Sequence, residues 1–410
     1  MNIKSLLIGS AAALVAVTGA RAADAVMAPE PEPVEYVRVC DAYGNGFFYI
    51  PGTETCLQIS GYVWYQVGAG SFDTTSAFGR GGDTTSYHYG ATAQDGWRKS
   101  VRARLNIDAR SETEWGTLRS YIRLQADWNG TGSYAGLGTN DGPVGIDQAY
   151  IQLGGLMMGY SESFYADSKN GGPSNYGSHS WSGMYYNYHE VALIGYRFES
   201  NGFFGAISLE DDALDGEGYV PDIVAKIGYG GGWGAIWAKV AYDESFDGTT
   251  GAGSFAALGT NDGGFAATIG AQFNIPNMPG SNLRLIGYYA DGAHRFNVGG
   301  PSAIYGPTGE SYYGGSEWSI LASYNHQFSE TLGASVAFQY FNDLYYAGTD
   351  YSSGVDAWAA ELSVVWFPVS QFEVRGELGY TDVGAFNAPA TATGNPDGAF
   401  SGFLRFTRYF

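Results

Sequence analysis

The sequence contains no apolar run long enough to cross a membrane as a helix. A spanning helix needs about 18 or more consecutive apolar residues, and no stretch after the first 22 residues approaches that length. A helical membrane protein is therefore excluded. Charged residues are also scarce, at 15% of the 410 residues, and basic ones are scarcest, with 20 Lys and Arg against 41 Asp and Glu. Such an acidic chain is not expected to bind nucleic acid, which requires a basic surface.

Cysteine and histidine are rare, which limits metal sites and catalytic chemistry. The two cysteines, Cys40 and Cys56, are close in sequence. In an exported protein they predict one disulfide, which stabilises by about 3 kcal/mol on the chain-entropy argument; two free buried thiols are the alternative. Neither cysteine has a histidine nearby to complete a metal site. The histidines lie outside any G-x-S-x-G or comparable hydrolase frame, and we expect them in loops or near strand ends: His88, His179, His189, His294 and His326.

The first 22 residues have the parts of a secretory signal peptide. Lys4 follows the start, Leu6 to Val17 is apolar, and Ala20-Arg21-Ala22 is a small-x-small cleavage site. Cleavage after Ala22 leaves 388 of the 410 residues, and loss of the two basic residues takes the formal net charge from −21 to −23. We expect residues 23–56 to form an N-terminal extended segment, because Pro and Glu alternate at its start.

Glycine and aromatic residues are abundant: 62 Gly, 32 Tyr, 23 Phe and 10 Trp. This composition favours strands joined by turns. From residue 57 onward, amphipathic segments are separated alternately by a very short and a long connection. Sixteen strands are predicted to begin at Leu57, Trp97, Thr117, Gly145, Leu156, Glu190, Phe203, Pro221, Gly234, Gly264, Leu283, Glu317, Leu332, Asp356, Phe372 and Ala399.

The alternation of short and long connections predicts the fold class. An outer-membrane barrel has short periplasmic turns, long external loops and an even number of strands of about 9–11 residues. The 388 residues give about 24 for each of sixteen strands with its connection, whereas an eight-stranded or a 22-stranded barrel does not fit. We therefore predict an all-β protein, a transmembrane antiparallel barrel of 16 strands over residues 57–410.

The hairpin from Trp97 to Trp128 concentrates basic residues on one face. Side chains in a strand alternate between two faces, so Val101, Leu105, Ile122 and Leu124 share an apolar face. The opposite face carries six arginines: Arg98, Arg102, Arg104, Arg110, Arg119 and Arg123. Either the apolar face covers a soluble core and the arginines meet bulk water, or the apolar face meets lipid and the arginines line a water-filled lumen.

Two roles are open for these arginines. A guanidinium is permanently charged and semi-rigid, which suits it to hold a fixed field across a pore. Alternatively, the arginines pair with Asp108, Asp127 or acidic residues of a loop and stiffen the barrel; both roles can hold at once. We expect Arg102, Arg104 and Arg123, which lie in mid-strand, to stand at the narrowest point rather than Arg98 and Arg110.

Three parts of the sequence carry a resemblance to a known family: A-D-A-V at Ala23, the hairpin arginines, and Val37 to Val63, which reads V-R-V-C-D-A-Y-G-N-G-F-F-Y-I-P-G-T-E-T-C-L-Q-I-S-G-Y-V. Together they resemble the alphaproteobacterial general porins. The final strand, which ends on Phe410, is also typical of outer-membrane barrels. The resemblance covers the whole chain after the signal peptide. It implies a homotrimer in the outer membrane, with each pore narrowed by an inward-folded third external loop. In this sequence that loop is Ser161 to His189 and contains Glu162 and Asp167.

These observations predict an outer-membrane porin for passive diffusion of small hydrophilic solutes and ions, with no cofactor and no metal. The candidate pore-lining residues are Arg98, Arg102, Arg104, Arg110, Arg119, Arg123, Glu162 and Asp167. Acidic loop residues such as Asp211 and Asp215 offer contacts, bridged by divalent cations, to lipopolysaccharide. The alternatives are a channel specific for sugars or organic acids, a barrel enzyme, and a soluble secreted β-protein. The net negative charge of the chain should enrich cations at the mouth of the pore. The arginines oppose this enrichment at the constriction, so a weak cation preference is predicted.

Overall fold

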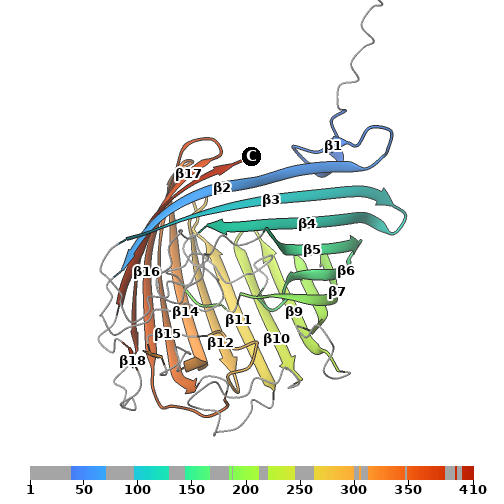
Figure 1. Ribbon diagram of the computed structural model, residues 1–410. Coiled ribbons are helices and arrows are strands. Elements are labelled where there is room, and N and C mark those ends of the chain that lie inside the picture. The colour runs from blue at the N-terminus through green and yellow to red at the C-terminus, as the bar shows by residue number, and fades with distance from the viewer. Residues whose placement is uncertain are drawn as a thin grey trace, which may run out of the picture.

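The computed structural model describes residues 38–70, 97–128, 144–166, 184–186, 188–211, 220–244, 263–299, 304–305, 313–346, 349–383, 393–394 and 399–410. Within these ranges, no helix is long and apolar enough to cross a membrane. The only helical turn in them is a short 3-10 helix, η1 (Asp41–Tyr43). All other regular structure in these ranges is β-strand (Figure 1).

Sixteen long strands make up the wall of the molecule. They are β2 (Cys56–Gly70), β3 (Trp97–Thr113), β4 (Gly116–Trp128), β5 (Gly145–Leu153), β6 (Leu156–Glu162), β7 (Glu190–Ser200), β8 (Phe203–Asp211), β9 (Asp222–Gly231), β10 (Gly234–Asp243), β11 (Gly264–Asn274), β12 (Asn282–Ala290), β14 (Tyr313–Ser329), β15 (Leu332–Tyr346), β16 (Ala357–Val369), β17 (Phe372–Val383) and β19 (Ala399–Tyr409). Three two-residue strands accompany them: β1 (Phe48–Tyr49), β13 (Ile304–Tyr305) and β18 (Thr393–Gly394).

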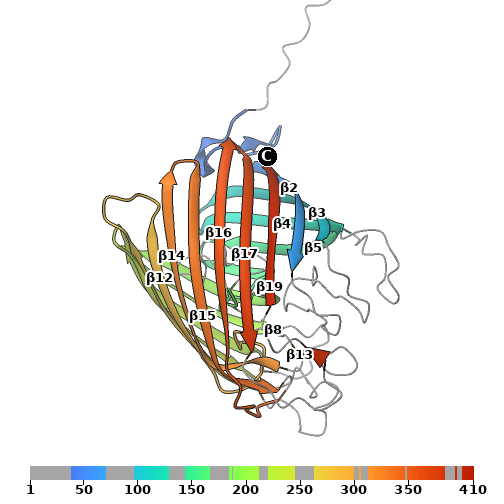
Figure 2. The same ribbon diagram turned by 90° about the vertical axis from the view of Figure 1, so that its left-hand side faces the viewer.

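The wall closes on itself through its first and last strands. Each long strand pairs antiparallel with the next, and β19 pairs with β2, with Tyr409 opposite Tyr62. The main chain of Phe410 extends this pairing, because its N–H donates to Gly61 O at 3.1 Å and its carbonyl accepts from Gly61 N at 3.0 Å. The two views show the resulting barrel, with the red C-terminal strand beside the blue β2 (Figures 1 and 2). The predicted sixteen-stranded antiparallel barrel is confirmed.

The strand starts agree with the sequence prediction to within one residue, with one exception. The strand expected to begin at Glu317 begins four residues earlier, at Tyr313, which pairs with Tyr346. The preceding Y-Y-G-G-S reads as a glycine-rich loop, but a register shift between Tyr313 and Gly315 accommodates the glycines within the strand. The expectation was wrong here because a bulge does not follow the strict two-residue alternation.

The short turns are shaped by residues that tolerate positive φ. Between β7 and β8, Asn201 has φ 51° and Gly202 has φ 83°. Positive φ at both central residues defines the two-residue hairpin turn that matches the twist of the flanking strands. A side chain at Gly202 would bring its Cβ to 2.6 Å from Gly230 O. The sequence Asn-Gly therefore fixes this turn and the register of the hairpin.

The outer surface of the barrel is apolar. Large aliphatic side chains stand exposed along successive strands, such as Ile227 at 60% and Ile269 at 69% exposure. The buried side chains of the same strands instead include many polar groups, such as Lys226 on β9 and Thr268 on β11. A wall that is apolar outside and polar inside is what a barrel in lipid requires. The apolar face of the Trp97–Trp128 hairpin is therefore its outer face, with Leu105 and Ile122 exposed.

The interior is not polar all the way round. Met184, from the connection between β6 and β7, packs in an apolar cluster with Trp237, Leu321 and Phe341 of the wall. A second cluster combines Phe164 and Tyr165 of the same connection with wall residues and with Phe296, from the connection between β12 and β14. The inner side of β7 to β16 therefore carries packed loop residues, and the opposite stretch of wall carries the arginines.

The N-terminal segment is fastened to one end of β2 and β3. Cys40 and Cys56 form the predicted disulfide, and both are buried with Phe47. Gln58 Nε2 donates to Asn45 O at 2.9 Å, and the Thr55 and Ser111 hydroxyls lie 3.1 Å apart. In Figure 1 this segment lies at the end of the long β2–β3 ribbon, beside β1. The prediction that one disulfide joins the two cysteines is confirmed.

Candidate functional site: the arginine belt

Alternation along β3 and β4 places the arginines inside the barrel. Ala103 and Leu105 are exposed on the outer face, whereas Arg102, just before them, is 8% exposed and Arg104, between them, is half-buried. Two further arginines, Arg375 of β17 and Arg405 of β19, lie on the inner face of the adjoining wall and are opposite each other in register. We call the inward guanidiniums of β17, β19, β3 and β4 the arginine belt: Arg375, Arg405, Arg102, Arg104 and Arg123.

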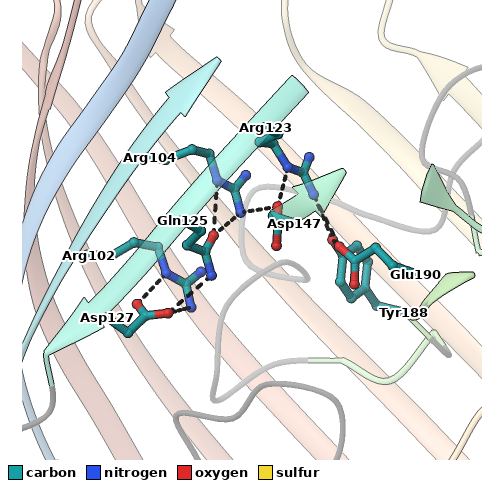
Figure 3. Close-up of polar contacts among 8 residues, drawn as sticks. All are labelled: Arg102, Arg104, Arg123, Gln125, Asp127, Asp147, Tyr188 and Glu190. Atoms are coloured by element: carbon teal, nitrogen blue, oxygen red, sulfur yellow. Dashed lines mark hydrogen bonds and ion pairs between the residues drawn. The ribbon is translucent and has the colours of Figure 1, made fainter. Parts of the chain in front are cut away.

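At one side of the belt, Arg102 is held by a carboxylate and by an aromatic ring. Its Nε donates to Asp127 Oδ1 at 2.6 Å and its Nη2 to Oδ2 at 3.2 Å (Figure 3). This two-point contact fixes the plane of the guanidinium. On its other side Arg102 lies over Trp64, 5.5 Å from the ring centroid, and Arg405 lies over the same ring at 4.9 Å. Trp64 therefore stabilises two like charges through cation–π contact.

Asp147 joins the next two arginines of the belt. Arg104 Nη2 lies 3.3 Å from Asp147 Oδ2, and Arg123 Nε donates to the same oxygen. Arg104 also donates from Nε to Gln125 Oε1 at 3.0 Å, and Gln125 in turn donates to Asp127 at 3.1 Å. Figure 3 shows this chain of contacts running from Asp127 to Glu190. The three arginines are thus parts of one hydrogen-bonded network.

A β-bulge puts Asp147 in this position. Arg123 is opposite Gln148 and Leu124 is opposite Ile146, so Asp147 is the extra residue on β5. A bulge residue has no cross-strand partner and turns its side chain away from the regular alternation. Asp147 can therefore reach both Arg104 of β3 and Arg123 of β4.

The connection between β6 and β7 meets the belt at Arg123. Arg123 Nη2 donates to Tyr188 OH at 3.1 Å and to Glu190 Oε1 at 3.1 Å, and Tyr188 OH donates to the same Glu190 oxygen. Burial raises the pKa of Tyr188 well above its ordinary value, so its hydroxyl stays neutral and remains a donor. Tyr188 and Glu190 thus anchor the end of the connection to the arginine wall.

A second pair of arginines lies nearer the turn end of the hairpin. Arg110 and Arg119 both bind Asp108 with two contacts each, at 3.0 and 2.7 Å and at 2.9 and 2.8 Å. Arg110 also lies over Phe47 of the disulfide-closed segment, 5.0 Å from its centroid. This pair therefore braces the N-terminal segment and the β3–β4 hairpin.

The remaining predicted site residues are placed in part. Glu162 ends β6, is half-buried, and is directly opposite Glu190 in register. Asp167 and the side chain of Arg98 lie outside the described part of the chain. Of the two roles weighed for the arginines, pairing with Asp108 and Asp127 is present in the structure.

Sequence reasoning missed several members of the site. Asp147 is the extra residue of a bulge, so the two-residue alternation does not predict its direction. Glu190 is the first residue of β7, where the alternation has not yet begun. Arg375 and Arg405 had a usable signal, because both alternate with apolar residues in F-E-V-R-G-E-L and F-L-R-F. Five described arginines of the hairpin contact four carboxylates, those of Asp108, Asp127, Asp147 and Glu190. The inner face of this hairpin is therefore a network of ion pairs with one more arginine than carboxylates, rather than a bare basic surface.

The other end of the β6–β7 connection is bound to the opposite wall. Phe164 N donates to the buried Glu210 of β8 at 2.9 Å, and Lys239 Nζ of β10 donates to Tyr165 O at 2.9 Å. Thr268 Oγ1 of β11 donates to Tyr165 OH at 2.8 Å. The two described ends of the connection that we expect to fold inward therefore contact inward-facing side chains of the wall. These ends are residues 163–166 and residues 184–189 without 187. Its middle lies outside the described residues.

A closed sixteen-stranded barrel with an apolar exterior and a charged interior defines a transmembrane channel of the outer-membrane class. Comparison with known proteins agrees. The profile of the Porin subfamily matches residues 24–400. Porin Omp2b of Brucella suis biovar 1 (strain 1330) is 35% identical over 436 residues, covering 100% of both chains. Porin Omp2b of Brucella neotomae is 36% identical over 433 residues with the same coverage.

Solved structures share the fold at low sequence identity. The outer membrane channel DcaP of Acinetobacter baumannii has a TM-score of 0.60 at 15% identity, covering 88% of this chain and 99% of that one. OmpT of Vibrio cholerae in its trimer form has a TM-score of 0.53 at 12% identity, covering 87% and 100%. The chain belongs to the porin family and is an outer-membrane porin. The resemblance to alphaproteobacterial porins is confirmed, and family membership indicates a channel rather than an enzyme.

Proposed function

We propose that the protein passes small hydrophilic solutes and ions by passive diffusion through the barrel, along the arginine belt. The observation that carries this proposal is the belt itself, a row of inward guanidiniums that faces a loop segment inside the lumen. The wall and the loop meet where Arg123 Nη2 donates to Tyr188 OH at 3.1 Å. Solutes pass beside this junction, and no covalent bond is made or broken.

Selectivity arises from the field between the belt and the acidic residues of the loop side. Arg102, Arg104 and Arg123 line the pore, with Glu162 and Glu190 on the facing side; Arg98 and Asp167 belong to the same proposed set. Fixed charges at a narrow point act on ions more strongly than charges in bulk water. The net negative charge enriches cations at the mouth, and the ion pairs of the belt leave only a small positive excess. A weak cation preference follows.

A channel with preferred solutes is the second candidate, because aromatic rings accompany the arginines along the wall. The rings of Tyr121 and Tyr150 are tilted to each other with their centroids 5.1 Å apart, and Arg119 lies over both. Tyr62 lies under Arg104 and beside Tyr409. Half-buried rings beside guanidiniums suit sugars or organic acids. Block of ion current by such a solute, saturating with its concentration, would favour this candidate over a general pore.

The assembly proposed is a homotrimer in the outer membrane, as in the trimer form described for OmpT of Vibrio cholerae. External acidic loop residues contact lipopolysaccharide through divalent cations. Residues 1–22 act as the export signal and are removed, and residues 23–56 form the N-terminal segment. No catalytic activity, cofactor or resident metal is assigned.

Single-channel recording of the detergent-extracted protein in planar bilayers tests the proposal. We expect discrete conductance steps, closures in groups of three, and a small reversal potential of cation-selective sign in a salt gradient. Absence of conductance from folded protein contradicts the pore. An anion-selective reversal potential contradicts the proposed balance of charge.

A further inference from the structure

One side chain of the barrel wall binds the inward loop in the way that a neighbouring strand would. Gln339 of β15 accepts from Tyr185 N at 2.8 Å through Oε1 and donates to Tyr185 O at 3.0 Å through Nε2. The amide thus pairs with both polar groups of one residue of the loop, as a peptide does in a sheet.

The surroundings hold this amide in one orientation. Its second Nε2 proton donates to Ser319 Oγ of the adjoining strand at 2.9 Å, and Gln339 has 0% exposure. Tyr185 packs edge-on against Phe341 with 5.3 Å between ring centroids, and Met184 lies in the apolar cluster with Leu321. Water therefore has little access to the Tyr185 peptide groups, and Gln339 is their partner.

The contact spans the barrel. The connection leaves β6 and returns to β7, whereas Gln339 lies on β15; six strands separate β7 from β15 in one direction and eight in the other. Three residues after Tyr185, Tyr188 meets Arg123 of β4. The segment from Tyr185 to Tyr188 is therefore fixed at both ends, by Gln339 on one wall and by the arginine belt on another.

We propose that Gln339 is a positioning residue of the pore: by pairing with Tyr185 on both its donor and its acceptor side, it fixes the distance between the loop and the arginine belt. The inference rests on the proposed diffusion function and adds the residue that holds the passage at constant width. Loss of the pairing frees the segment to move toward the belt and interrupt the current.

Two substitutions separate the pairing from packing. Gln339→Leu keeps the volume but removes both hydrogen bonds. Gln339→Glu keeps an acceptor for Tyr185 N, but its carboxylate has no donor for Tyr185 O. When protonated, the carboxylic acid regains one O–H and again matches the amide. Gln327→Leu and Gln327→Glu on the neighbouring strand are the matched controls, because Gln327 donates to the turn carbonyls Ser329 O and Leu332 O.

The test is single-channel recording of the parent and of each reconstituted variant at pH ~9.5 and at pH ~4, because burial raises the pKa of the introduced carboxyl group and these two values lie on either side of its titration. We expect Gln339→Leu at both pH values, and Gln339→Glu at the higher pH, to close about tenfold more often than the parent, because a partly buried peptide group then loses its hydrogen-bond partner. Acidification of the same Gln339→Glu channel should restore parent behaviour, and the Gln327 variants should follow the parent throughout.

The acid rescue is measured within one inserted channel, so it does not depend on how well a variant folds. If Gln339→Leu yields no folded protein, the Gln339→Glu comparison alone decides. Closing rates within twofold of the parent at the higher pH overturn the inference, as does a defect in Gln339→Glu that acid leaves unchanged. If the variants conduct and their closing rates do not respond to the substitutions or to pH, only the inference about Gln339 is contradicted. If the parent shows no conductance at all, the proposed diffusion pore is contradicted.

Discussion

Arg123 of β4 and Asp147 of β5 are joined by a hydrogen bond from the guanidinium Nε to the carboxylate, and this contact exists because a bulge turns Asp147 out of the regular alternation. The same carboxylate serves Arg104. One bulge residue therefore sets the position of two charges on the inner face of the wall, and the field that we propose for the pore depends on a local irregularity of that wall.

Replacement of Asp147 by Asn should change selectivity and stability together. The variant leaves Arg104 and Arg123 without their shared negative charge, so the reversal potential in a salt gradient should move toward anions. Breaking a partly buried pair of this kind costs about 3 kcal/mol, which should appear as unfolding at lower temperature in detergent. Asp356→Asn, at an exposed carboxylate beside Tyr340, is the control. A shift toward cations would contradict the assignment.

Removal of two belt arginines should act in the opposite direction. Arg102→Ala combined with Arg123→Ala leaves Asp127 and Glu190 uncompensated on the inner wall, so cation preference should increase. Arg408→Ala is the matched control, since Arg408 is exposed at the rim and donates to Gln371. Reversal potentials decide the matter. If the double variant matches the parent, these arginines do not act on permeating ions.

Loss of the disulfide should loosen the N-terminal segment without abolishing conduction. In Cys40→Ser combined with Cys56→Ser, the segment loses the covalent constraint over a separation of 16 residues, worth about 3 kcal/mol on the chain-entropy argument. Proteases should then cut between the two positions in folded barrels, whereas the parent resists. Single-channel current measures the second half of the prediction, and a large loss of current would mean that the segment shapes the pore itself.

Tyr188 should weaken the protein in alkali. Burial raises its pKa in the folded state above the ordinary value of about 10. A raised tyrosine pKa gives stability that is fully present below the unfolded pKa and is lost as pH rises above it, because only the unfolded chain then ionises freely. Tyr188→Phe should therefore lose less stability than the parent when the pH rises from ~7 to above ~10. Urea titrations at two pH values measure this, and an equal alkaline loss in both proteins would exclude Tyr188 as a cause.

The strands were predictable from the sequence because lipid and lumen impose the simplest periodicity that a chain can carry. Ile107 and Ile122 had to face one way and Arg102 and Arg123 the other, so strand number, faces and the short turns followed. The one misplaced strand start lies at a bulge, and Asp147 escaped notice for the same reason. Alternation carries no information about residues that depart from it.

The loop anchors had no signal in the sequence for a different reason. Glu210, Gln339 and Phe296 contact residues that are tens to hundreds of positions away, and each is an ordinary inward or loop residue in its own segment. Gln339 is 154 residues from Tyr185. Such contacts follow from the shape of the closed interior, so they become visible only when opposite walls of the barrel are placed together.

The seam between β19 and β2 has a consequence for how the channel comes into being. Arg405 and Gln66 are hydrogen-bonded at 2.8 Å across 339 residues of chain, and Trp64, which lies under both Arg102 and Arg405, is at the same seam. Until the last strand docks, the arginine belt is interrupted at its middle and β2 offers an unpaired edge to any other strand. Contacts of such long range form late in folding. Charge selectivity should thus arise in one step with barrel closure. A chain whose last strand has not yet docked would be an open sheet prone to aggregate, rather than a channel without selectivity.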